Sequence, residues 1–174
     1  FNQEKEKNSK ELYAKIMNYF VIVVCTIFLF VMFYIDVLKY FINNEILWQG
    51  LTIVPILLIA NVCLGIYYNL SIWYKLTYKT GYGALISIFG AIITVVLNII
   101  LIPIMGYEGS AWTTLICYSV MVLVSYLLGQ KFYPIPYNLK KIFGYVLGAV
   151  LLFMLSEFLL SNLIIPIKLM LNTV

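Results

Sequence analysis

The sequence predicts an all-α fold, a polytopic membrane helix bundle with five full transmembrane helices plus a truncated sixth. Hydrophobic residues make up 64% of the 174 residues, and only 10% are charged. A soluble domain needs more polar cover than this composition provides. The apolar residues also form runs of about 20, which is long enough to cross a bilayer as a helix. These runs are continuously apolar rather than alternating, so strands are not expected.

Residues 1–17 are expected to form a charged helical lead on the cytoplasmic side of the membrane. Glu6 and Lys10 are four residues apart, as are Glu11 and Lys15, and this spacing stabilises a helix through ion pairs. An anchor that lies on the lipid surface is the alternative interpretation of this segment.

Residues 18–174 are expected to form the transmembrane bundle. The predicted spans are 18–42, 47–74, 82–105, 110–130 and 142–160, with the first half of a sixth beginning at Leu163. The chain begins with Phe1 and ends within an apolar stretch at Val174. We therefore expect it to be part of a longer protein.

The lysines predict the orientation of the bundle. If the spans alternate in direction, nine of the eleven basic residues fall on one side, and only Lys39 and Lys168 fall on the other. An excess of lysine marks the cytoplasmic side of a membrane protein. The N-terminus of the chain is therefore predicted to be cytoplasmic. The nine lysines are Lys5, Lys7, Lys10, Lys15, Lys75, Lys79, Lys131, Lys140 and Lys141.

The composition argues against an enzyme active site and against a metal site. The chain contains no histidine and no arginine, which removes a common proton shuttle and the best ligand for phosphate. Cys25, Cys63 and Cys117 each lie within an apolar run, so we interpret them as small buried hydrophobic residues. The net charge of +4 is explained by lysines in loops rather than by binding to nucleic acid.

A few polar residues lie within the predicted spans. Asn61 lies near the middle of the second span, with Asn69 two turns further on, and Asn98 lies deep in the third. Asn61 and Asn98 could each tie two helices together or line a polar path, and the sequence leaves both alternatives open. Asp36 has Lys39 one turn away near the end of the first span. We expect this pair to form an ion pair at the membrane interface, with a role in transport as the alternative.

Aromatic residues gather where the second span ends. We expect an interfacial belt there, and a stacking surface for sugars is the alternative. Lys75 and Lys79 lie in the same segment and are expected to determine topology, although they could also attract an anionic headgroup. The aromatic residues are Tyr67, Tyr68, Trp73, Tyr74, Tyr78 and Tyr82.

The segment from Leu97 to Leu115 is predicted to be a hairpin that turns at Gly106 and Gly109. Its residues also resemble a known family. The order Asn98, Leu101-Ile102-Pro103, Gly106, Gly109-Ser110-Ala111 and Thr114 is similar to the N…LIP…G…GAA…AT pattern of bacterial oligosaccharide flippases. These are polysaccharide biosynthesis exporters of the multidrug/oligosaccharidyl-lipid/polysaccharide superfamily. The likeness covers about Ile46 to Ile142, with Trp112 as a departure where the family has a small residue.

This resemblance implies a transporter with 14 helices in two lobes, of which the chain supplies the helices from the ninth onward. The implied function is flipping of a lipid-linked oligosaccharide, a polyprenyl-pyrophosphate sugar, across the bacterial inner membrane for surface polysaccharide or lipopolysaccharide biosynthesis. The implied partners are this substrate, membrane lipids and the N-terminal lobe of the same chain, without cofactor or nucleic acid. The substrate-binding candidates are Asn61, Tyr68, Asn69, Lys75 and Asn98.

Two further functions remain open at this stage. A small-molecule or multidrug exporter of the same superfamily has the same kind of helix bundle. A membrane-embedded enzyme or an assembly subunit of the polysaccharide pathway is the other alternative. The enzyme would need clusters of ionisable residues at a membrane face, and the segment contains none.

Overall fold

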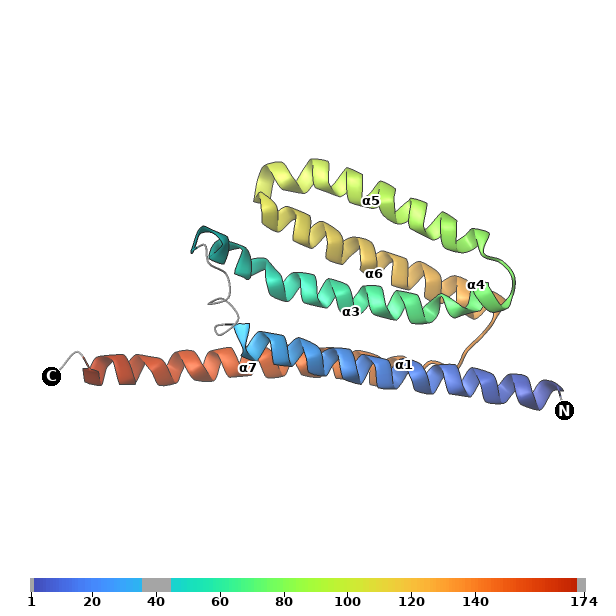
Figure 1. Ribbon diagram of the computed structural model, residues 1–174, viewed down its shortest axis with the longest axis horizontal. Helices are drawn as coiled ribbons and strands as arrows, with labels where there is room; N and C mark the ends of the chain where they lie inside the picture. Colours follow the sequence, from blue (N-terminus) through green and yellow to red (C-terminus); the bar gives the residue numbers. More distant parts are fainter. Residues whose placement is uncertain (1, 36–44, 172–174) are drawn as a thin grey trace.

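The computed structural model describes residues 2–35 and 45–171, and the described part is mainly helical and contains no strand (Figure 1). Five of its helical segments are long and apolar enough to cross a membrane, as the sequence predicts. The elements in chain order are α1 (Asn2–Phe33), the 3₁₀ helix η2 (Glu45–Ile53), α3 (Val54–Leu70), α4 (Ile72–Leu76), α5 (Gly81–Met105), α6 (Tyr107–Phe132) and α7 (Leu139–Leu171).

Helix α1 joins the charged lead and the first span in one uninterrupted rod. Its 32 residues include no glycine or proline, so nothing in the sequence breaks the helix near residue 17. One of the predicted pairs forms, because Lys10 Nζ lies 2.8 Å from Glu6 Oε1. The cytoplasmic placement of the lead stays a prediction. Asp36, Lys39 and the predicted end of the span at Ile42 lie outside the described residues.

The second span is divided at Ser71, where α3 ends and α4 begins. Pro55 lies in the first turn of α3, where a missing N–H costs no hydrogen bond. Ser71 is buried, and its Oγ donates to the carbonyl of Tyr68 over 2.6 Å. Helix α4 then ends in a turn in which Tyr78 takes a left-handed backbone conformation, with φ of 56°.

Helices α5 and α6 form the hairpin that the sequence predicts. Gly106 has φ of 60°, a conformation that a side chain strongly disfavours, and its N–H donates to the carbonyl of Ile102. Gly109 lies against the backbone of Leu101, so closely that a Cβ would be 2.5 Å from the Leu101 carbonyl oxygen. The turn and the start of α6 therefore both depend on glycine.

The connection from α6 to α7 is folded against the bundle. Gln130 Nε2 donates to the carbonyl of Ile135 over 2.8 Å, and the Ile135 side chain is buried. Tyr137 packs against the buried core and has its ring 6.5 Å from that of Tyr126. Burial raises the pKa of the Tyr137 hydroxyl above its usual range.

This raised pKa predicts a loss of stability at high pH. Above about pH 10, an unfolded tyrosine releases its proton while folded Tyr137 retains it, so rising pH favours the unfolded state. The free energy of unfolding should therefore fall as pH rises through this range, and it should fall less in Tyr137→Phe. The measurement is unfolding in detergent at a series of alkaline pH values. Tyr78→Phe is the control because Tyr78 is 94% exposed, and an equal effect of both substitutions would contradict the assignment.

Helix α7 differs from the sequence prediction at its end. The stretch from Leu163 was expected to begin a separate sixth span, but it continues α7 as far as Leu171. The preceding Ser161 and Asn162 provide no glycine or proline that would end the helix. The described residues therefore form five spanning segments and no separate sixth one, and the last helix extends beyond the predicted end at residue 160.

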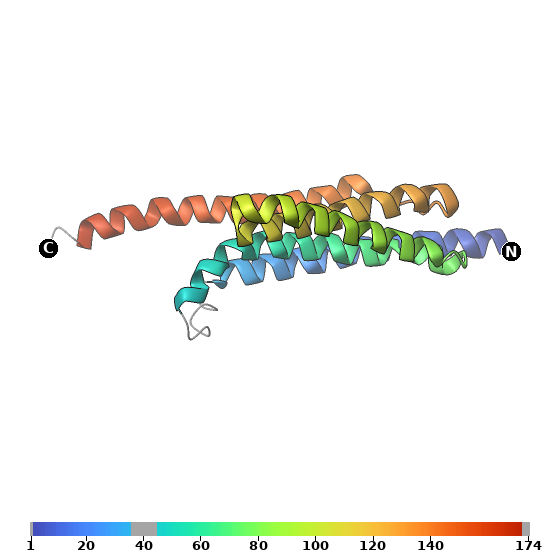
Figure 2. The same ribbon diagram turned by 90° about the horizontal axis from the view of Figure 1, so that it is seen from above.

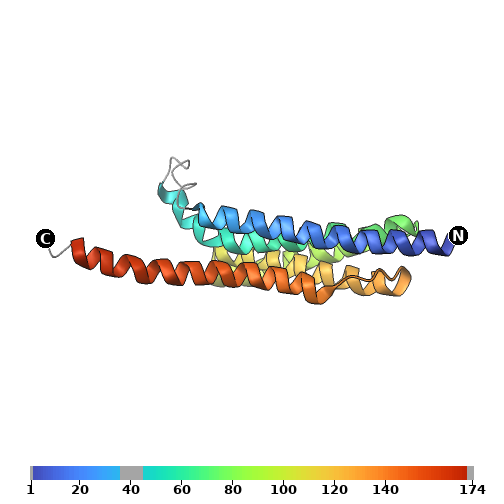
Figure 3. The same ribbon diagram turned by 90° about the horizontal axis from the view of Figure 1, so that it is seen from below.

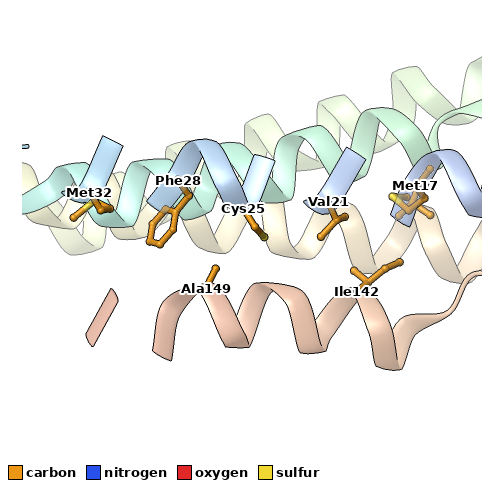
Figure 4. Close-up of a cluster of buried hydrophobic side chains, with 8 residues drawn as sticks. Met17, Val21, Cys25, Phe28, Met32, Ile142 and Ala149 are labelled. Atoms are coloured by element: carbon orange, nitrogen blue, oxygen red, sulfur yellow. The ribbon is translucent and has the colours of Figure 1, made fainter. Parts of the chain in front are cut away.

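Helices α6 and α1 each pack mainly against two other helices of the bundle. Helix α6 lies between α3 and α5, while α1 packs against α7 and α3, and Figures 2 and 3 show these rods side by side. Five residues of α1 form a buried stripe at intervals of three and four residues, which is one face of a helix. Figure 4 shows this stripe facing Ile142 and Ala149 of α7. The stripe consists of Met17, Val21, Cys25, Phe28 and Met32.

The rest of the surface suits a lipid environment. Large apolar side chains are exposed along the helices, including Ile99 at 69% and Ile104 at 74%. Lipid tails can cover such residues, whereas water would not. The rods alternate in direction, so the start of α1, the α4–α5 turn and the α6–α7 connection lie at one end of the bundle (Figure 1). These segments carry the nine lysines, and the side of the membrane on which they lie stays a prediction.

Candidate ligand cavity between α3, α5 and α6

A cavity of about 530 Å³ lies between α3, α5 and α6, and its lining reaches Lys75 and Thr80 at the lysine-rich end. Its lining combines hydroxyl groups with one ammonium group, that of Lys75, and it includes no carboxylate. Such a lining offers many hydrogen bonds to a polar ligand and a single positive charge. The hydroxyl-bearing residues are Tyr67, Tyr68, Ser71, Tyr74, Thr80, Ser87, Thr94 and Tyr118.

Tyr67 holds one wall of the cavity in place. It belongs to α3, is 4% exposed, and its hydroxyl lies near the side chains of Ser87 of α5 and Tyr74 of α4. A buried hydroxyl needs such partners, since an unpaired one would be costly in an apolar setting. The contacts therefore connect three helical elements at the level of the cavity.

Small residues of α5 create the hollow. Gly83, Ser87, Gly90 and Thr94 are spaced by three or four residues, so they share one helix face. A Cβ at Gly90 would be 2.7 Å from the sulfur of Met121, which shows how closely α6 approaches there. Thr94 Oγ1 donates to the carbonyl of Gly90 over 2.9 Å. This face therefore combines close helix packing with polar atoms.

The structure brings two of the five predicted site residues to this cavity. Tyr68 and Lys75 both line it, at positions seven residues apart on α3 and α4. Tyr68 also borders a second cavity of about 240 Å³, which Asn69 and Tyr13 line as well. Asn69 Nδ2 donates to the Gly65 carbonyl over 3.1 Å, so its amide is partly used within its own helix. Asn69 therefore lies beside the main cavity rather than in it.

The other two predicted residues lie apart from the cavity. Asn61 is exposed on α3, and its Nδ2 donates to the Leu57 carbonyl of the same helix over 2.8 Å. Asn98 follows Thr94 by one turn of α5, and its Oδ1 is buried without a hydrogen-bond partner among the described residues. Thr113 of α6 carries a second unpaired oxygen, in a side chain that is 0% exposed. Neither asparagine ties two helices together within the described part of the chain.

Sequence reasoning missed several residues that line the cavity. Tyr67 was treated as part of an aromatic belt, and Ser87 and Thr94 were not singled out. The signal that could have identified them is the stripe of small and hydroxyl-bearing residues at 83, 87, 90 and 94. Continued by four residues, this stripe reaches Asn98, the one member that the sequence did single out.

The aromatic residues at the end of α3 do not form a uniform belt. Trp73 is 1% exposed, stacks against Phe132 with ring centroids 5.6 Å apart, and donates from Nε1 to Ser125 Oγ over 3.4 Å. It therefore fastens α4 to α6 and is closed to any ligand. Tyr78, by contrast, is 94% exposed and lies where an interfacial residue would.

One cysteine, Cys117, borders the cavity. All three cysteines are free, and Cys117 Sγ is directed to the carbonyl of Gly90 at 3.2 Å. Across residues 2–35 and 45–171, histidine, cysteine and carboxylate side chains form no group that could hold a metal ion.

Comparisons with known proteins give no relative for this arrangement. No family model matches the chain, and neither the curated proteins nor the solved structures provide a match. The geometry of the cavity is therefore what the functional argument rests on.

Proposed function

We propose that the chain is part of a flippase that carries a lipid-linked oligosaccharide precursor across the bacterial inner membrane, for surface polysaccharide or lipopolysaccharide biosynthesis. The observation that carries this proposal is the cavity between α3, α5 and α6, whose lining is rich in hydroxyl groups, contains no carboxylate and includes Lys75 at the lysine-rich end. We regard the chain as a transporter component rather than an enzyme.

The chemistry of the cargo explains why such a cavity is needed. A pyrophosphate-sugar headgroup cannot cross hydrocarbon unaided, because moving charges and hydroxyl groups out of water is costly. Hydroxyl groups such as those of Ser87 and Thr80 can exchange hydrogen bonds with sugar hydroxyls. Lys75 provides the positive charge that the pyrophosphate requires at the entrance. Its counterparts in an N-terminal lobe of the same chain would complete the path in the two-lobe arrangement.

The test is a complementation experiment in the cell that produces the intact protein. Deletion of the gene should accumulate the lipid-linked precursor on the inner leaflet and remove the surface polysaccharide. Ser87→Leu should fail to restore it, since the larger side chain fills the cavity. Lys75→Gln should reduce transport roughly fivefold, the effect of one charge near an anionic group. Amounts of precursor and of surface polysaccharide are the measurements.

The matched control is Ile99→Leu, on the same helix α5, because Ile99 is 69% exposed and does not line this cavity. It should restore transport fully. Normal surface polysaccharide after deletion would contradict the proposed cargo, and an accompanying loss of resistance to small toxic compounds would favour an exporter instead.

A further inference from the structure

Two lysine ammonium groups lie beside the ring of Phe132, at the same lysine-rich end of the bundle. Lys79 Nζ lies 3.9 Å from the centre of this ring, and Lys131 Nζ lies 5.8 Å from it. Trp73 stacks against the ring and Tyr82 lies 5.2 Å away. The ring therefore gathers two ammonium groups from segments that are 52 residues apart in the chain.

No carboxylate among the described residues neutralises these two positive charges. In residues 2–35 and 45–171, the recorded ion pair joins Lys10 to Glu6, and neither Lys79 nor Lys131 contacts a carboxylate. Both lysines are exposed. Their distances from one ring place the ammonium groups within about 10 Å of each other, which is one Debye length at 0.1 M salt. The site thus attracts an anion.

Two hollows follow one another along α5 beside these charges, and we refer to them together as the groove. The first part, about 520 Å³, is lined by Lys79, Gly81, Tyr82 and Leu85. The second, about 340 Å³, is lined by residues between Ile88 and Val96, all of them apolar. Leu85, Ile88, Ile92 and Val95 recur at intervals of three and four, so both parts share one helix face.

The length of this groove matches one leaflet of a bilayer. From Leu85 to Val96 the helix rises about 16 Å, and half of the hydrocarbon core measures about 15 Å. The charges lie at the outer limit of this distance, where headgroups lie, and the apolar part extends toward the middle of the membrane. One molecule with an anionic head and an acyl tail would satisfy both parts together.

We propose that an anionic phospholipid of the bilayer docks along α5, with its phosphate held by Lys79 and Lys131 and one acyl chain in the groove from Leu85 to Val96. Basic pockets between transmembrane helices are known to bind such headgroups. This site shares only Ala91 with the lining of the polar cavity and does not depend on the cargo proposed above. It would link the α4–α5 turn to the end of α6 through a lipid.

The test is native mass spectrometry of the intact protein, with phosphatidylglycerol and phosphatidylcholine of identical acyl chains as probes. We expect preferential retention of phosphatidylglycerol. The double variant Lys79→Gln/Lys131→Gln should bind it about 25-fold more weakly, because each lysine near an anionic surface is worth about fivefold. The control Lys140→Gln/Lys141→Gln removes the same charge at the same end and should bind normally.

Two further measurements separate this site from simpler explanations. Lys79→Arg/Lys131→Arg should retain the lipid, which shows that the loss in the glutamine variant comes from charge and not from misfolding. Soluble glycerophosphoglycerol should not compete, since it has no acyl chain for the groove. Equal losses in both glutamine variants, equal retention of the two lipids, or competition by the soluble headgroup would each overturn the proposal.

Discussion

Replacing Trp73 with alanine should cost about 3–5 kcal/mol of the free energy of unfolding, the usual range for removing a buried aromatic side chain. Trp73 is 1% exposed, stacks against Phe132 and donates to Ser125. It also packs onto Gly129, where a Cβ would lie 2.9 Å from the indole ring. Alanine would leave a cavity that the glycine cannot fill. The cost comes mainly from lost packing contacts, because lipid supplies no hydrophobic driving force between helices.

The measurement is equilibrium unfolding in mixed micelles, followed by circular dichroism. Trp112→Ala is the matched control, since Trp112 is 41% exposed on α6 and should cost far less. Trp73→Phe should recover most of the stability, because the stacking remains and only one hydrogen bond is lost, worth about 0.5–1.5 kcal/mol. Equal destabilisation by Trp73→Ala and Trp112→Ala would show that Trp73 does not fasten α4 to α6.

The second large effect is expected at Gly109. A Cβ there would lie 2.5 Å from the Leu101 carbonyl oxygen and 2.7 Å from its carbonyl carbon. These are backbone atoms, so no side-chain rotation relieves the overlap, and α5 and α6 must separate. Gly109→Ala should therefore destabilise the protein by about 1–3 kcal/mol, the range for overpacking. Gly109→Leu should exceed this range.

Gly144→Ala provides the comparison for this substitution. Nothing lies within 4 Å of a Cβ at Gly144, and alanine has the higher helix propensity, so this change should be neutral or slightly stabilising. The two variants can be compared by thermal unfolding in the same detergent. If Gly109→Ala unfolds at the same temperature as the unaltered protein, the close approach of α5 and α6 is not a feature of the folded state.

The sequence predicts the number of spanning segments well, because lipid requires continuous apolar runs and these are visible without a structure. The hairpin at Gly106 is also predictable, since proline and glycine limit where the helices can end. The boundaries are less predictable. Residue 17 and Ser161 mark changes in polarity, but α1 and α7 run through them because polarity alone does not end a helix.

The candidate site was harder to predict than the spans. Asn61 was selected for its polarity, yet it faces outward and bonds to its own helix. Ser87 lies in the cavity although a hydroxyl in a transmembrane helix carries little signal. Whether Asn61 or Ser87 faces the cavity depends on the rotation of its helix about the helix axis, and this rotation is set by packing against α6. The spacing of residues in the sequence shows that they share one face of a helix. Whether that face lines a cavity or meets lipid is determined by the neighbouring helices.

The unbroken course of α1 has a mechanical consequence. Its 32 residues form a rod of about 48 Å, whereas the hydrocarbon core measures about 30 Å. If α1 spans a bilayer, its charged first turns project beyond the hydrocarbon core as a rigid extension of the helix. Because α1 contains no glycine or proline that could act as a hinge, a displacement of its N-terminal turns tilts the whole helix. A partner that binds those turns would therefore also displace Phe28 and Met32, which lie at the other end of α1 in the buried cluster shared with α7.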